Sequence, residues 1–364
     1  MNSEAIVQAC RKVPSPALLV LPELVRSNIA RMIAMTRSPA RLRPHLKTTK
    51  MPKVVQLLLD VGITQFKCAT LSEMHMALEA GARDVLLAYQ PAGPNIQIFF
   101  DLCRAWPEAN LSTVVDCEAI AQQLAHGNDT VEVYIDVNCG MHRTGILPGE
   151  NAIALFRKIQ DHENLLFQGW HVYDGHLHQS SLTDRQAAVT ECFEPVWEML
   201  AATDPKATVV AGGTPTFPIH AQDPRVICSP GTCVFWDAGY ANKVPDMTFD
   251  WAAVLLTRII SKPDSQHLTL DLGHKAVASE NPLEHRVVFP AIPDAVFVSQ
   301  SEEHLVIRTD KATEWSVGDT LLGIPWHVCP TVALYDRATT IIDDHVHDIW
   351  EIPARRRDIP ASLP

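Results

Sequence analysis

The sequence predicts an α/β protein with an N-terminal (β/α)8 barrel of the TIM type and a C-terminal, mainly antiparallel β domain. Short apolar segments alternate with helix-like segments eight times over about 190 residues, as in a barrel of βα units. Beyond about residue 250 the helical pattern ends, and strand candidates follow one another between turn residues. The alternative is a doubly wound open sheet, because that fold contains the same βαβ unit.

Hydrophobic spacing gives the elements of the barrel region. An apolar strand is expected at Ala17–Leu21, and a helix at Glu23–Thr36. The eight barrel strands are expected at Arg41–His45, Thr64–Ala69, Asp84–Ala88, Leu111–Val115, Val131–Val137, Leu166–Val172, Ala207–Ala211 and Arg225–Cys228. The helices are expected at Lys53–Val61, Ser72–Ala80, Pro94–Trp106, Cys117–Ala125, Glu150–Asp161 and Thr183–Ala202.

The β domain is expected to begin near residue 241, so that the barrel domain spans 22–240 and the β domain 241–364. Turn signals such as Pro263-Asp264-Ser265 separate its strands. The strands are expected at Ala252–Ile260, His267–Asp271, Ala295–Val298, His304–Arg308, Thr320–Leu322, Trp326–Leu334, Thr339–Ile342 and Ile349–Ile352.

Composition excludes some classes of function. The formal net charge of −12 over 364 residues argues against a nucleic-acid binder, which needs Lys and Arg to neutralise phosphates. No apolar run approaches the roughly 18 residues of a membrane span. Met1–Ser15 has no signal-peptide core, and the nine cysteines show no CxxC spacing. We therefore expect a cytoplasmic protein with reduced thiols and no membrane partner.

The first candidate for chemistry is Lys47, at the end of the first barrel strand. Active sites of such barrels lie at the carboxyl ends of the strands. Lys47 stands in the basic segment RPHLKTTK, where Arg43 and His45 are expected neighbours that would lower its pKa. A lysine of lowered pKa acts as an amine nucleophile toward a carbonyl. Read alone, the segment is more typical of a solvated basic turn.

Two glycine turns follow strands seven and eight. Gly212-Gly213-Thr214 and Gly231-Thr232 have the composition of a divided phosphate cradle, in which backbone N–H groups approach the phosphate and threonine hydroxyls donate. Barrels often bind phosphate after these two strands. The alternative is two ordinary tight turns.

Four further side chains lie at the same predicted rim. Arg143 can hydrogen-bond a ring atom of a bound cofactor, and Tyr173 can pack against a planar ring. His176 and His178 are candidates for proton transfer, because histidine titrates near neutral pH. Each of the four also has an ordinary structural interpretation as a surface or rim residue.

The β domain carries the segment Pro325-Trp326-His327-Val328-Cys329-Pro330. On the predicted strand Trp326–Leu334, residues two apart point to the same side, so His327 and Cys329 can share one metal ion. Zinc is the best match for imidazole with thiolate. The alternative is a buried thiol beside a satisfied histidine, since free cysteine is often buried.

These motifs together resemble the D-threonine aldolase and D-serine dehydratase family, which belongs to the alanine racemase type (fold type III) of pyridoxal-phosphate enzymes. The motifs are RPHLKTTK, CATLSE, DVNCGMHRTG, YDGH, GGTPTFP, SPGTCVFWD and PWHVCPT, in order from about Pro16 to Asp336. The lysine motif and the late His-x-Cys are the most specific of them.

The resemblance implies a barrel that holds pyridoxal 5'-phosphate, and a β domain that includes residues 1–21. Members of the family are usually homodimers. Lys47 matches the lysine that binds the cofactor covalently, and Arg143 and Tyr173 match positions near its ring. The phosphate-binding positions are matched by Gly213, Thr214, Gly231 and Thr232. His327 and Cys329 match the pair that binds a divalent metal, Zn²⁺ or Mn²⁺.

The implied activity is retro-aldol cleavage of a D-3-hydroxy amino acid such as D-threonine to glycine and an aldehyde, with His176 or His178 as the base. Two departures bear on this expectation. Thr49 stands where a histidine is common, and Cys329 also fits the dehydratases. The alternatives are a D-serine dehydratase that forms pyruvate and ammonia, a racemase, for which the metal pair has no use, and a non-catalytic pyridoxal-phosphate carrier.

Overall fold

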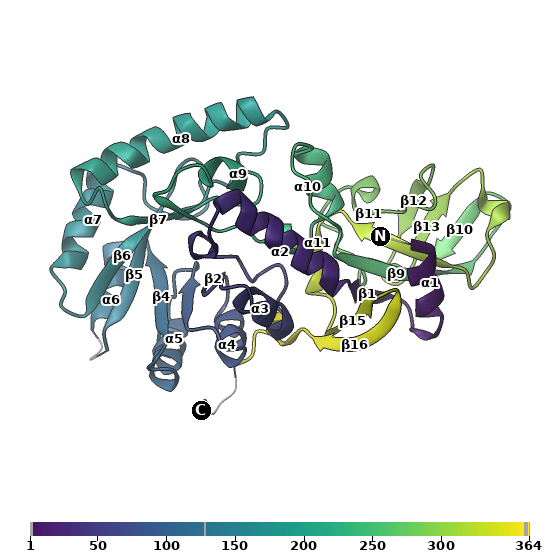
Figure 1. Ribbon diagram of the computed structural model, residues 1–364, viewed down its shortest axis with the longest axis horizontal. Helices are drawn as coiled ribbons and strands as arrows, with labels where there is room; N and C mark the ends of the chain where they lie inside the picture. The colour runs from purple at the N-terminus through teal and green to yellow at the C-terminus, as the bar shows by residue number, and fades with distance from the viewer. Residues whose placement is uncertain (1–2, 127–128, 360–362, 364) are drawn as a thin grey trace. The chain divides into compact units, whose positions relative to one another are not determined.

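The computed structural model describes residues 3–126, 129–359 and 363 (Figure 1). Its strands form a seven-stranded parallel sheet and a nine-stranded, mainly antiparallel sheet. The residues group into two compact units. The first unit comprises Met1–Ala30, Thr48–Met51 and Thr232–Arg355, and the second comprises Arg31–Lys47, Pro52–Gly231 and Arg356–Pro364. The domain limits expected from the sequence, 22–240 and 241–364 with 1–21, stay a prediction.

The second unit is built on parallel strands in the order β2-β3-β4-β5-β6-β7-β8. This confirms the predicted second to eighth barrel strands to within one or two residues at each end. The strands are β2 Gln65–Cys68, β3 Asp84–Leu87, β4 Asn110–Val115, β5 Val131–Val137, β6 Leu165–Val172, β7 Thr208–Ala211 and β8 Val226–Cys228. Side chains from four of them, Leu86, Val114, Tyr134 and Val210, pack together as a buried core.

The predicted first strand, Arg41–His45, is wrong as a regular strand. Pro39–Arg41 forms the 3-10 helix η2, and only single bridges follow, from Leu42 to Cys228 and from His45 to Lys67. The N–H of His45 donates to the carbonyl oxygen of Pro230 at 3.0 Å, and that of Leu46 to Lys67 at 2.8 Å. Pro44 has no N–H and cannot continue a ladder. The segment therefore joins β8 to β2 and closes the barrel without becoming a strand.

Helices lie between successive strands of this unit and cover them from outside (Figure 1). They confirm the six predicted helices. The helices are α3 Pro52–Leu59, α4 Leu71–Glu79, α5 Pro94–Ala105, α6 Glu118–Ala125, α7 Glu150–Gln160 and α8 Leu182–Ala202, followed by the short α9 Phe217–His220. Thr70 caps α4, because its hydroxyl accepts the N–H of Glu73.

The first unit contains the nine-stranded sheet. Its main path runs β12-β13-β10-β9-β1-β15-β16, and β14 pairs with β9 and β11. The strand expected at Ala17–Leu21 is β1, which pairs antiparallel with β9 and parallel with β15. The strands are β1 Ala17–Val20, β9 Ala253–Ser261, β10 His267–Leu270, β11 Val287–Val288, β12 Val296–Gln300, β13 Leu305–Arg308, β14 Thr320–Pro325, β15 Arg337–Ile342 and β16 His345–Glu351.

Four helices also belong to this unit: α1 Ser3–Ala9, α2 Pro22–Thr36, α10 Ala238–Lys243 and α11 Val328–Val332. Helix α2 begins there and ends in the second unit, and it confirms the helix expected at Glu23–Thr36. No helix of the described residues is long and apolar enough to cross a membrane.

The predicted strand Trp326–Leu334 is wrong. Strand β14 ends at Pro325, and helix α11 begins at Val328 with His327 as its N-cap. Pro330 lies in the first turn of α11, where its missing N–H costs no hydrogen bond. The Asp237 carboxylate accepts the N–H of Val328 at 3.1 Å, which satisfies one of the free donors at the start of the helix. His327 and Cys329 are therefore not paired across the face of a strand.

Candidate functional site

Three cationic side chains of the second unit surround the ring of Tyr173. Tyr173 directly follows β6, and Lys47 follows the segment that closes the barrel. The Lys47 Nζ lies 5.6 Å from the ring centroid, and the Arg143 guanidinium carbon lies 4.8 Å from it. The third cation is Lys67 of β2, at 5.7 Å. The structure thus brings together the three residues that the sequence predicted near a cofactor ring.

Two glycines allow the Tyr173 ring to lie against the backbone. A Cβ added at Gly175 would collide with the Tyr173 hydroxyl. A Cβ at Gly213 would lie 3.2 Å from the Tyr173 Cε2 atom. Any larger residue at Gly175 would displace the ring. Gly213, which the sequence predicted for phosphate binding, therefore also has a packing role.

Asp174 organises the turn after β7. Its buried carboxylate accepts hydrogen bonds from His220 Nε2 at 2.7 Å, from the Thr216 hydroxyl at 2.9 Å and from the Gly213 N–H at 3.3 Å. Burial alone would raise the pKa of Asp174, but these donors hold it below its ordinary value. Asp174 therefore stays ionised and fixes the shape of the Gly212-Gly213-Thr214 turn.

The predicted phosphate cradle differs from a simple pair of open turns. The Gly213 N–H is already donated to Asp174, while Gly212 has a φ of +79°, which favours glycine. Thr232, the threonine of the turn after β8, starts a 3-10 helix in the first unit. Ser229 lies 2% exposed directly after β8, and its hydroxyl has no hydrogen-bond partner. A buried hydroxyl without a partner can donate a hydrogen bond to a bound anion such as phosphate.

Sequence reasoning missed a buried chain of polar residues inside the barrel. The Lys67 Nζ lies 3.4 Å from His171 Nε2, and His171 Nδ1 lies 2.7 Å from the Asp136 carboxylate. The Thr144 hydroxyl donates to the other Asp136 oxygen at 2.8 Å. A lysine and a histidine at inward positions of otherwise apolar strands were the available signal. Both residues lie within predicted strands, Thr64–Ala69 and Leu166–Val172.

The two candidate bases differ in environment. His176 is half-buried, and its Nδ1 atom is buried without a hydrogen-bond partner. Burial is the main cause that lowers the pKa of His176, so its ring is neutral at neutral pH. A Cβ at Gly140 would lie 3.1 Å from its Nε2 atom, so Gly140 leaves room for the ring. His178 is exposed to solvent.

Arg43 does not occupy the place expected for it beside Lys47. Its guanidinium pairs with Asp84 at 2.7 Å and donates to the carbonyl oxygen of Phe66. Asp84 begins β3, so Arg43 points toward the amino ends of the strands. His45 behaves as expected of a neighbour, since its Nδ1 accepts the N–H of Lys47 at 3.3 Å.

The first unit holds His327 and Cys329 together at the start of α11. Burial lowers the pKa of His327, but hydrogen bonds that its ring donates to Cys329 and Glu280 outweigh burial and raise it to about 9. The His327 Nδ1 lies 2.6 Å from the Glu280 carboxylate. The Cys329 Sγ lies 3.1 Å from the Thr48 hydroxyl and 3.5 Å from that of Thr232.

This donor set fits a divalent metal with two protein ligands. A carboxylate on one imidazole nitrogen is the usual partner of a metal-binding histidine, because it fixes the tautomer and leaves the other nitrogen for the metal. Imidazole with thiolate suits zinc. Within the described residues, no cluster of three or more His, Cys, Asp or Glu side chains could hold a metal ion. Other coordination positions would thus belong to water or substrate.

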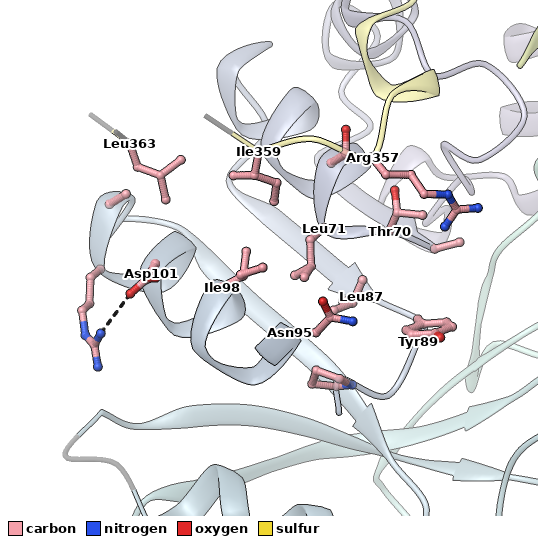
Figure 2. Close-up of a pocket in the computed structure, with 15 residues that line it drawn as sticks. Thr70, Leu71, Leu87, Tyr89, Asn95, Ile98, Asp101, Arg357, Ile359 and Leu363 are labelled. Carbon is pink, nitrogen blue, oxygen red and sulfur yellow. Dashed lines mark hydrogen bonds and ion pairs between the residues drawn. The ribbon is translucent and has the colours of Figure 1, made fainter. Parts of the chain in front are cut away.

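A large cavity of the second unit lies away from the Tyr173 ring. It has a volume of about 760 Å³ and lies between α4, α5 and the C-terminal residues (Figure 2). Leu71, Ile98 and Ile359 form its apolar wall. Among the described residues that line it, none is a predicted site residue. Size alone therefore does not identify the candidate site, which is defined by the residues around Tyr173.

A parallel (β/α) barrel with a lysine at its rim, and a separate antiparallel sheet, define the class of fold type III pyridoxal-phosphate enzymes. Residues 22–238 match the family model described as the N-terminal domain of alanine racemase. Residues 252–341 match the model described as a putative serine dehydratase domain. The chain belongs to this alanine racemase-like family and carries a domain of the D-threonine aldolase and D-serine dehydratase type.

Curated relatives match over nearly the full length. A D-threonine aldolase of Arthrobacter sp. is 26% identical over 363 residues, which cover 94% of this chain and 93% of that protein. A D-threo-3-hydroxyaspartate dehydratase of Delftia sp. is 25% identical over 373 residues, which cover 93% and 96%. Relatives of similar identity thus include both an aldolase and a dehydratase.

Solved structures show the same fold. The crystal structure of a D-threonine aldolase from Filomicrobium marinum has a TM-score of 0.87 at 24% identity and covers 95% of this chain and 96% of that one. A Cys→Ala mutant of a D-threo-3-hydroxyaspartate dehydratase, described as the metal-free form, has a TM-score of 0.80 at 23% identity, with coverage of 94% and 98%. Both similarities support the architecture of the two sheets.

Proposed function

We propose that the protein is a pyridoxal-phosphate- and metal-dependent lyase that cleaves D-3-hydroxy amino acids of the D-threonine type to glycine and an aldehyde. The convergence of Lys47 and Arg143 on the Tyr173 ring carries the proposal. The match of residues 22–238 to the alanine racemase family and the similarity to a D-threonine aldolase support it.

In this proposal the second unit holds the cofactor. Lys47 binds it covalently, and Arg143 and Tyr173 contact its ring. In this unit Gly213, Thr214 and Gly231 surround its phosphate, and the unpaired Ser229 hydroxyl donates to the same group. Pyridoxal phosphate, when bound, supplies the electron sink that lets a bond at the α-carbon of an amino acid break.

The base in this proposal is His176 rather than His178. Proton abstraction requires a neutral ring with a free nitrogen, and burial keeps His176 neutral. Its role is to remove the proton of the substrate hydroxyl. His178 is exposed and would contribute less.

His327 and Cys329 hold the metal, Zn²⁺ or Mn²⁺, in the first unit. A divalent ion lowers the pKa of a hydroxyl that it binds, and so prepares that group for loss of its proton. The Cys→Ala mutant of the dehydratase relative, described as metal-free, supports a cysteine ligand. Glu280 fixes the orientation of His327.

The second candidate is dehydration of D-serine or a related 3-hydroxy amino acid. The observation that favours it is Cys329, because a Cys→Ala mutant of the dehydratase relative is described as the metal-free form. Lys47 would then remove the α-proton, and the metal would assist departure of the hydroxyl. The same residues serve both reactions, so product identity separates them.

The test is a substrate panel with product analysis. Purified protein loaded with pyridoxal phosphate is incubated with D-threonine, D-serine and D-3-hydroxyaspartate, with and without a chelator. Glycine and acetaldehyde from D-threonine support the aldolase, whereas pyruvate from D-serine alone would refute it. Lys47→Ala should lose borohydride-stable attachment of the cofactor, as read by mass spectrometry, and the exposed Lys53→Met serves as control.

Two further expectations belong to this proposal. A chelator should abolish the activity. Full activity without metal would favour a metal-independent reaction, whereas no activity on any substrate would favour a non-catalytic carrier. From the family resemblance we also propose a homodimer, which sedimentation of the loaded protein would test.

A further inference from the structure

A second lysine approaches the ring that Lys47 approaches. Lys67 is 2% exposed, and its Nζ lies 5.7 Å from the Tyr173 ring centroid, against 5.6 Å for Lys47. Burying an ammonium group is costly unless its surroundings compensate. The proposed function assigns a role to Lys47 but none to Lys67.

Asp136, His171 and Lys67 form a chain of hydrogen-bonding side chains. The Asp136 carboxylate faces His171 Nδ1 at 2.7 Å, and His171 Nε2 faces the Lys67 Nζ at 3.4 Å. A carboxylate accepts the Nδ1–H, so Nε2 is left as an acceptor for a lysine N–H. The order carboxylate, imidazole, reactive group is that of a catalytic triad, with an amine in the third place.

We propose that Lys67 is a second acid–base group of the Tyr173 pocket, and that His171 and Asp136 are positioning residues that aim its amine. The inference rests on the proposed function and adds a step to it. An N–H bond of the Lys67 ammonium breaks and a C–H bond forms at the α-carbon of the glycine product. The reverse transfer removes the same proton, so no further reactant is consumed.

The charges around Lys67 suit proton exchange near neutral pH. Burial, and next the charge of Lys47, lower the pKa of Lys67 to about 7. An acid–base group works best when its pKa lies near the working pH. The titratable and charged groups that face Lys67 are Lys47 and Arg43, which lower its pKa, Asp136 and Asp174, which raise it, and His171 and Tyr173.

The first experiment needs no enzymatic activity. The cofactor-free protein is labelled with ¹³C-lysine, and the Lys67 signal, assigned with K67M, is followed by NMR across a pH series. We expect a midpoint well below that of the exposed Lys53. Asp136→Asn should lower the midpoint further, because it removes a negative charge. A midpoint equal to that of Lys53 would overturn the inference.

The second experiment follows the α-hydrogens of glycine in D2O by proton NMR with cofactor-loaded protein. K67M should slow the exchange by about 100-fold, the usual contribution of a general acid–base group. K67R restores a cation and N–H donors but no amine that titrates, so it should stay slow. Lys53→Met should exchange like the parent protein.

The outcomes separate the two proposals. Parent-like exchange by loaded K67M or K67R overturns the role of Lys67 and leaves cleavage of D-threonine intact. If the parent protein cleaves D-threonine but does not exchange the α-hydrogens of glycine, the role of Lys67 is overturned and the proposed function is not. A parent protein that neither exchanges glycine nor cleaves any D-3-hydroxy amino acid overturns both proposals.

Discussion

Ser229 shows at the scale of one residue how a buried group without a partner indicates a ligand. Its hydroxyl lies directly after β8 and pairs with nothing in the described structure. Leaving such a group unpaired costs about 1–3 kcal/mol, and a bound anion would recover part of that.

Ser229→Ala should therefore weaken cofactor binding by about tenfold, since it removes one hydrogen bond to the phosphate. The cofactor-free variant should be as stable as the parent protein or more stable, because the unpaired hydroxyl is gone. Fluorescence titration with pyridoxal phosphate and urea unfolding of the cofactor-free protein check both parts. Unchanged affinity would contradict the phosphate assignment of this turn.

In the first unit, Glu280 supports the proposed metal site, because its carboxylate accepts a hydrogen bond from the proposed metal ligand His327. Glu280→Gln should weaken binding of Zn²⁺ or Mn²⁺ by about 10–100-fold, the usual effect of removing such a partner. Metal content after dialysis against graded chelator measures the loss. The exposed Glu284→Gln, from the same segment, is the control and should bind metal like the parent protein.

At the scale of elements, the turn after β7 depends on Asp174 of the turn after β6. Asp174→Asn should destabilise the protein by about 3 kcal/mol at pH 7, because His220, Thr216 and Gly213 lose an ionised acceptor. The pKa of Asp174 lies below its ordinary value of 3.8, so its contribution is present above pH 3.8 and fades as the pH falls through the folded-state pKa.

Urea unfolding at neutral and acidic pH measures this difference between parent and variant. The difference should shrink in acid. The exposed Asp161→Asn is the control, and it should change stability by less than about 0.5 kcal/mol. A difference that grows in acid would show that Asp174 is not ionised in the folded protein.

Element by element, sequence patterns predicted what depends on periodicity and missed what depends on tertiary hydrogen bonds. Alternating apolar and helical segments located β2 to β8 and the helices between them. They misassigned Arg41–His45, because Pro44 favours extended backbone before it, and this extended segment pairs only through single bridges. They misassigned Trp326–Leu334, because the Asp237 carboxylate that starts α11 comes from a distant part of the chain.

In the candidate site, too, sequence motifs predicted some residues, and tertiary contacts alone reveal others. Lys47, Arg143 and Tyr173 could be predicted because motif and rim position agreed, and the structure brings them together. Lys67 was only hinted at by its place in an otherwise apolar strand, since only the folded barrel shows that it faces inward beside His171. The spacing of His327 and Cys329 predicted their proximity. The predicted shared strand face was wrong, because the two residues lie at the start of α11.

For the whole molecule, the buried charge of Lys67 has a consequence for stability. The pKa of Lys67 is about 7 in the folded protein and 10.5 ordinarily. Between these values the unfolded chain binds more protons than the folded one, so stability rises with pH. Below about pH 7 the lysine is charged in both states, and the cost of its burial is fully present.

K67M removes this dependence. The stability of cofactor-free K67M relative to the parent protein should be greatest at pH 7 and should decline by on the order of a few kcal/mol toward pH 10. Parallel urea unfolding series of both proteins measure the difference. A difference independent of pH would mean that Lys67 titrates at its ordinary pKa when folded.

The closure of the barrel has a consequence for the time at which Lys47 becomes ordered during synthesis. His45 donates its N–H to Pro230, so the segment that ends at Lys47 finds one of its two neighbours only after nearly the whole barrel has left the ribosome. A nascent chain released before Pro230 has Lys47 but no β8 to hold its segment. In the proposed function, capture of the cofactor by Lys47 is thus a late event of chain growth, although this lysine is made early.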